Sequence, residues 1–166
     1  MSTMVPQSDT EILQGKRIMF VEDRQPVIDL FLEELPQLIG NPVIITRVKT
    51  LSEAVHEIGE AAPEFDLVVI DLHMPGELPS ELRRYADLIG PDLNEGQALG
   101  LWLHATRKNI RYLYLTSVPE AYKSLADDAP AQAEPINKFL ESPFDFPARL
   151  AGVLRNTSET TGTAPR

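Results

Sequence analysis

The sequence predicts an α/β protein built on a parallel sheet with helices on both faces. Short apolar segments alternate with segments of helical periodicity, and this alternation is typical of a parallel sheet. Four of the apolar segments also run directly into a polar residue. The length of 166 residues and the 43% hydrophobic content suit one domain with a sizeable core.

The elements are expected in the order of five β-α units. The apolar segments predict strands at 18–21, 43–48, 67–70, 112–115 and 135–137. Helical periodicity predicts helices near 27–35, 52–58, 97–103, 121–125 and 146–154, with Ser52 and Glu53 opening the second of them. Residues 1–15 are expected to form a flexible extension, in which Ile12 and Leu13 allow local packing, and 156–166 a disordered polar tail.

Polar side chains follow four of these strands. Glu22 and Asp23 follow the first, Asp71 closes the third, Thr116 follows the fourth and Lys138 the fifth. Open α/β sheets build their sites at the carboxyl ends of strands, so these side chains are expected to meet. Three converging carboxylates repel one another unless a hard cation neutralises them, and oxygen ligands suit Mg²⁺.

Simpler interpretations exist for each of these residues. Glu22 and Asp23 suit the start of a helix that Pro26 begins, and capping is compatible with metal binding. An isolated Asp after a strand is often only a loop or helix cap. The simpler interpretation of Lys138 is a solvated lysine, but the apolar Ile136 and Phe139 beside it favour the end of an element. Ser117 competes with Thr116 for the role of hydroxyl donor.

In this order and spacing, the strand-end residues resemble the receiver domain of two-component response regulators from about Lys16 to Arg155. The resemblance implies a flavodoxin-like, doubly wound sheet of order 2-1-3-4-5 with its site between the first and third strands. It further implies that Asp71 is the phosphoacceptor, assisted by Thr116 and Lys138. The implied Mg²⁺ ligands are Glu22, Asp23, Asp71 and the backbone carbonyl of His73.

The implied partners are a histidine kinase or histidine phosphotransfer protein and an unidentified downstream protein. Activity beyond self-phosphorylation and autodephosphorylation is not expected. The net charge of −10 argues against a nucleic-acid surface, and the absence of cysteine excludes disulfides and thiolate sites. No stretch is apolar enough to span a bilayer, so a cytoplasmic location is expected, while monomer or homodimer is left open.

Three departures from the receiver pattern bear on function. An insertion at 77–95 follows the phosphoacceptor loop and is expected to form a short amphipathic helix that starts near Pro79 and Ser80. It is either a tolerated surface elaboration or a lid or docking element over Asp71. Pro135 replaces the side chain that usually switches rotamer, and Phe139 replaces the usual proline after the lysine. These two departures favour an alternative, a pseudo-receiver that acts as a constitutive protein-binding module.

Overall fold

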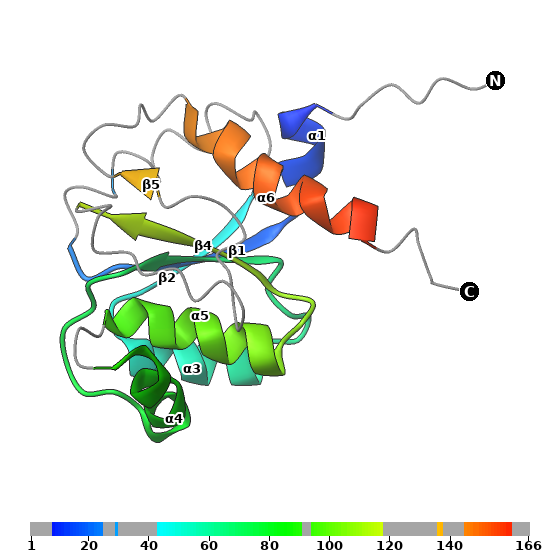
Figure 1. The fold of residues 1–166 in the computed structure, drawn as a ribbon. Coiled ribbons are helices and arrows are strands. Elements are labelled where there is room, and N and C mark those ends of the chain that lie inside the picture. Colours follow the sequence, from blue (N-terminus) through cyan, green and yellow to red (C-terminus); the bar gives the residue numbers. More distant parts are fainter. Residues whose placement is uncertain are drawn as a thin grey trace, which may run out of the picture.

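The structure is a computed structural model that describes residues 8–24, 29, 43–90, 94–117, 136–137 and 145–160, without the side chains of 137 and 156–160. Five strands and five helices are described along the chain (Figure 1). In chain order they are α1 (Asp9–Leu13), β1 (Arg17–Val21), β2 (Ile44–Val48), α3 (Leu51–Glu60), β3 (Leu67–Asp71), α4 (Ser80–Ile89), α5 (Glu95–Thr106), β4 (Arg111–Thr116), β5 (Ile136–Asn137) and α6 (Phe146–Thr160).

The strands form one parallel sheet in the order β2-β1-β3-β4-β5. The step from β1 to β3 brings two strands together that are separated in sequence by β2 and α3. In this pair Val21 lies opposite Ile70, and in the next pair Asp71 lies opposite Leu115. The predicted α/β fold with a parallel sheet is confirmed.

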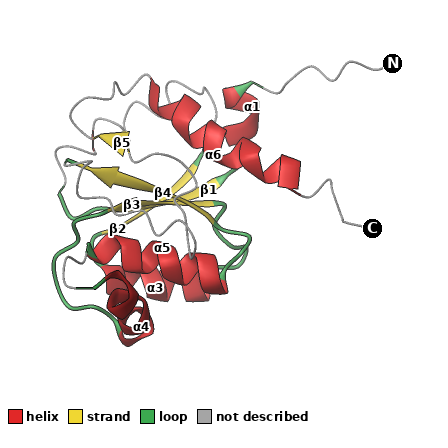
Figure 2. Cartoon of the chain, viewed as in Figure 1, coloured by secondary structure: helices red, strands yellow, loops and turns green. Residues whose placement is uncertain are grey.

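Helices cover both faces of the sheet (Figure 2). One core lies between the sheet and α3, α4 and α5, and the other lies between the sheet and α1 and α6. Successive residues of a strand enter opposite cores, so Met19 and Val21 pack with the first group and Ile18 and Phe20 with the second. The second core includes the ring pair Phe20 and Phe146, whose centroids lie 5.8 Å apart.

The insertion forms α4, as the spacing of its apolar residues predicts. The helix starts after Pro79 and ends at Gly90, whose φ of 88° suits glycine. Its buried residues Leu82 and Ala86 belong to the core shared with α5, so α4 adds an outer layer on α5, away from the sheet (Figure 1). The described part of the insertion therefore extends the core, and its apolar face is directed at α5.

Helical structure extends past the predicted domain boundaries at both ends. Residues 9–13 form α1, which Ser8 caps by accepting a hydrogen bond from the Glu11 N–H. The Leu13 side chain is fully buried in the core beside α6, which explains why this segment is held on the domain. At the other end α6 continues to Thr160, beyond the predicted start of the tail at 156.

The start of α3 also differs from the prediction. Thr50, rather than Ser52, is the N-cap, and its hydroxyl accepts from the Glu53 N–H at 3.1 Å. The helices expected near 27–35 and 121–125 lie outside the described residues, apart from residue 29, which is helical. Pro135, Lys138 and Phe139 lie outside them as well. Among the described residues, no helix combines the length and apolarity needed to cross a membrane.

Two glycines on one face of α5, Gly96 and Gly100, let this helix lie close to the sheet. A Cβ atom at Gly100 would lie 1.9 Å from the Tyr114 hydroxyl oxygen and 2.7 Å from the ring carbon that carries it. The Tyr114 side chain is buried, and its ring packs edge-on against Tyr112 at a centroid distance of 5.7 Å. The phenol therefore occupies space that a residue larger than glycine would need, and this contact joins α5 to β4.

We predict that Gly100→Ala lowers the free energy of unfolding by about 1–3 kcal/mol, because the added methyl overpacks a core that has no room for it. Urea denaturation measures this change. Gly59→Ala in α3 is the matched control, since a Cβ atom there would meet nothing within 4 Å, and it should stabilise by about 0.5–1 kcal/mol. Adding Tyr114→Phe should recover part of the Gly100→Ala loss; equal losses in the single and double variants would contradict this packing.

Candidate functional site

Three carboxylates meet where β1 and β3 end side by side. One oxygen from each of Glu22, Asp23 and Asp71 lies within 4.8 Å of the other two. Glu22 and Asp23 come directly after β1, and Asp71 is the last residue of β3. Glu22 is fully buried, Asp71 is 3% exposed and Asp23 is half-buried. The sheet order therefore brings together acidic residues that lie far apart in the sequence, on either side of β2 and α3.

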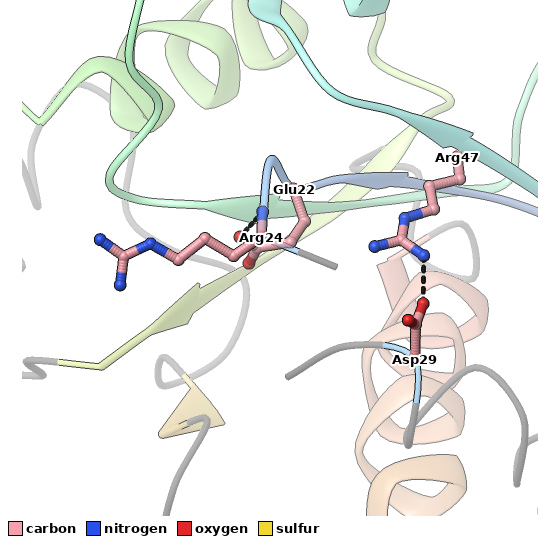
Figure 3. A network of polar contacts seen from close by, with 4 residues as sticks. All are labelled: Glu22, Arg24, Asp29 and Arg47. Atoms are coloured by element: carbon pink, nitrogen blue, oxygen red, sulfur yellow. Dashed lines mark hydrogen bonds and ion pairs between the residues drawn. The ribbon is translucent and has the colours of Figure 1, made fainter. Parts of the chain in front are cut away.

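Backbone N–H groups in the following loops orient two of these carboxylates. The Arg24 N–H donates to Glu22 Oε1 at 3.0 Å (Figure 3), and the His73 N–H donates to Asp71 Oδ1 at 3.0 Å. Both bonds join residues two positions apart, the local pattern by which short acidic side chains stabilise turns. The conformation of each loop thus determines the direction of its carboxylate, and the exposed His73 side chain takes no part in this bond.

Two arginines lie close to the carboxylate cluster in the sequence or in the sheet. Arg47 lies on β2, next to β1, but its guanidinium is directed at Asp29, with which it forms an ion pair (Figure 3). The Arg24 side chain is exposed, and the bond from this residue to Glu22 comes from its backbone. Three carboxylates in so small a volume repel one another, and their oxygen donors match the ligands that Mg²⁺ prefers. The donor set therefore fits a divalent hard cation.

The register of β4 places Thr116 at the same edge of the sheet. Asp71 lies opposite Leu115, and the Leu72 N–H donates to the Leu115 carbonyl at 2.9 Å. Thr116 is the next residue and its side chain is buried. It lies opposite Asn137, the last described residue of β5. Lys138 lies outside the described residues, and its role in the site and that of the His73 carbonyl as a metal ligand stay predictions.

Gly96 is a site neighbour that the sequence alone did not identify. A Cβ atom at this position would lie 2.1 Å from the Asp71 carbonyl oxygen and 2.9 Å from the Leu72 Cα. The Gly96 N–H also donates to the Leu72 carbonyl at 3.1 Å. The first turn of α5 thus rests on the backbone that carries Asp71. A glycine in the first turn of a predicted helix was the available signal, because it often marks close backbone approach.

We predict that Asp23→Asn raises the free energy of unfolding by about 1 kcal/mol in metal-free buffer, because it removes one of three mutually repelling charges. The Asp23 side chain suits this test, since it is only half-buried. Urea denaturation in EDTA measures the change. Asp87→Asn on the exposed side of α4 makes the same change in net charge and should leave stability nearly unaltered. Equal effects of the two substitutions would show that the site carries no local repulsion.

No family profile matches the chain, and no curated protein matches it in sequence. Solved structures with similar folds include RcsB from Salmonella enterica serovar Typhimurium bound to a promoter in the presence of the phosphomimetic BeF₃⁻, with a TM-score of 0.61 and 16% identity. That match covers 86% of this chain and 62% of RcsB. A chain of the CheX–CheY–BeF₃⁻–Mg²⁺ complex from Borrelia burgdorferi matches with a TM-score of 0.57 and 17% identity, over 91% of this chain and 98% of that one.

The N-terminal domain of a response regulator/sensory box/GGDEF three-domain protein from Carboxydothermus hydrogenoformans is also similar. Its TM-score is 0.60 at 14% identity, and the match covers 88% of this chain and 99% of the domain. These similarities are to response regulators of three organisms and extend over most of the chain. The chain therefore has the fold of a response-regulator receiver domain.

Proposed function

We propose that this protein is a phosphoacceptor module of the response-regulator type, in which Asp71 receives a phosphoryl group. The observation that carries the proposal is the carboxylate cluster of Glu22, Asp23 and Asp71, within 4.8 Å at the carboxyl end of a receiver-like sheet. The source would be the phosphohistidine of a histidine kinase or a histidine phosphotransfer protein. Carboxylates are established nucleophiles that form acyl phosphates, so the residue type suits this role.

The proposed step is a single displacement at phosphorus. A carboxylate oxygen of Asp71 forms a new P–O bond while the P–N bond of the phosphohistidine breaks, and the electron pair of that bond returns to the imidazole nitrogen. Asp71 is 3% exposed and its Oδ1 accepts from the His73 N–H, so the nucleophile is oriented before a donor arrives. Fixed orientation removes part of the entropic cost of bringing the reactants together.

The other residues of the site would stabilise the negative charge on the transferred phosphoryl group. Glu22, Asp23, Asp71 and the His73 carbonyl would hold Mg²⁺, which neutralises the phosphoryl oxygens when bound. Thr116 would donate a hydrogen bond to these oxygens and Lys138 would supply a positive charge. The fully buried Glu22 is held by the Arg24 N–H and supports the site from the side of β1.

Output would come from protein-protein contact that depends on phosphorylation. The acyl phosphate adds negative charge beside Gly96, where α5 rests on the backbone of Asp71 and Leu72. A small movement of this backbone would be passed to α5, because the two are in direct contact, and a shift between two conformations would change affinity for a partner. Among the similar structures, one is a CheX–CheY complex and another is RcsB bound to a promoter; we propose a protein partner here.

A second candidate function is a pseudo-receiver that binds its partner constitutively. Pro135 and Phe139 favour it, because a proline three residues before Lys138 cannot switch rotamer and the usual proline after the lysine is missing. The intact set of Glu22, Asp23, Asp71 and Thr116 at the sheet edge favours phosphorylation instead. Covalent modification of Asp71 separates the two functions.

We expect one phosphoryl group to be added when the protein is incubated with a small-molecule acyl phosphate or phosphoramidate and Mg²⁺. Intact-mass spectrometry measures the addition. It should be absent from Asp71→Asn and after EDTA treatment, and it should persist in Asp87→Asn, which removes a carboxylate from exposed α4. Addition that survives Asp71→Asn, or no addition under conditions that label a response regulator run in parallel, would contradict the proposal and favour the constitutive binding module.

A further inference from the structure

A cavity lies at the opposite end of the sheet from the carboxylates. It has a volume of about 260 Å³ and is lined by residues from the end of α5, the following loop and the start of β4. These residues are His104, Arg107, Lys108, Ile110 and Arg111. β4 runs from Arg111 at this cavity to Thr116 at the Asp71 edge, so the two sites lie about one strand length apart, roughly 15–20 Å.

The lining is cationic, although the protein as a whole is acidic. Four of the five lining residues are basic side chains and none is a carboxylate, in a chain whose net charge is −10. Within the described residues, none of Arg107, Lys108 and Arg111 forms an ion pair with a carboxylate. Positive charge gathered in a partly enclosed space without internal partners attracts anions.

Arg111 provides the most specific observation. Its Nε is buried and has no hydrogen-bond partner within the described part of the chain. The backbone of the same residue is fixed, because its N–H donates to the Asp66 carbonyl at 3.0 Å. A buried donor without a partner costs free energy, and an acceptor on a ligand recovers that cost only if the guanidinium turns toward the cavity, because Nε itself has almost no accessible surface. Arg111 therefore lines the cavity with a donor whose hydrogen bond is not made within the described residues.

Arg107 is held in place as well. The Arg107 guanidinium lies over the Trp102 ring at 5.7 Å from the centroid, a cation–π contact that restricts its movement. The Arg107 N–H donates to the Leu103 carbonyl at 2.8 Å, and the Ile110 N–H donates to the Arg107 carbonyl at 3.0 Å. These bonds shape a tight turn between α5 and β4, so less of the Arg107 side-chain freedom is lost when a ligand binds.

We propose that this cavity, named here the basic pocket, binds a small phosphate-bearing anion. The planar guanidinium of arginine can donate two parallel hydrogen bonds to phosphate oxygens, Lys108 adds a positive charge at the exposed rim, and His104 adds a ring nitrogen there. The volume fits inorganic phosphate or pyrophosphate, and it is below the range of drug-sized ligand sites. The site is independent of the phosphoacceptor site, with which it shares no residue.

The test uses the full chain carrying Asp71→Asn, in EDTA, so that the carboxylate site contributes no phosphate binding. Inorganic phosphate, pyrophosphate, citrate and a short oligonucleotide are titrated separately by calorimetry, and phosphate is also titrated by amide NMR. Lys108→Gln and Arg111→Gln remove one cation each from the basic pocket. The control is Arg83→Gln and Arg84→Gln on the exposed side of α4, with the same charge change per substitution.

We expect phosphate or pyrophosphate to bind with the largest amide shifts at residues 104–111, and each pocket variant to raise Kd by about tenfold or more. The control variants should change Kd by less than about twofold. The proposal is overturned if no phosphate anion binds, if the shifts fall elsewhere, or if control and pocket variants weaken binding equally. Tighter binding of citrate or of the oligonucleotide would overturn the assigned ligand class. The NMR titration uses the unsubstituted pocket, so it still tests the proposal if Arg111→Gln does not fold.

Discussion

The mutual repulsion of three carboxylates is the constraint on which the proposed function depends. β1 lies next to β3 in the sheet, and this pairing brings Glu22 and Asp23 close to Asp71. Backbone N–H groups orient Glu22 and Asp71. Three carboxylates held this close repel one another, and the Mg²⁺ of the proposed function would relieve that repulsion.

Helix α5 connects the carboxylate cluster to the rest of the molecule. Gly96 lets the first turn of α5 contact the Asp71 backbone, and Gly100 leaves room in the next turn for the Tyr114 phenol. On its outer side α5 carries α4, whose Leu82 and Ala86 enter the same core. A change at Asp71 would therefore reach β4 and the insertion through one helix, without the rotameric switch that Pro135 removes. Under the proposed function, this path would make the insertion a docking element for the partner.

The sequence was sufficient for the fold and for most of the carboxylate site. Short apolar segments predicted the strands, helical spacing predicted α4, and the polar residues that follow the strands identified Glu22, Asp23 and Asp71 as candidates that the structure brings together. Sequence could not show that Leu13 is buried, because a five-residue helix is held by tertiary contacts with α6 rather than by its own propensity. Nor could it show the fit of Gly96 against Asp71, or that Arg107, Lys108 and Arg111 line one cavity, because both depend on packing between elements.

The most direct test of the central claim is a crystal structure determined with Mn²⁺ in place of Mg²⁺, using the anomalous signal of the metal. We expect one anomalous peak between Glu22, Asp23 and Asp71, with carboxylate oxygens of Asp23 and Asp71 at coordination distance. The peak should disappear in Asp71→Asn or move away from β3. A structure at saturating Mn²⁺ with no peak at this cluster, or with the metal bound elsewhere on the acidic surface, would contradict the assignment of a metal-dependent phosphoacceptor site.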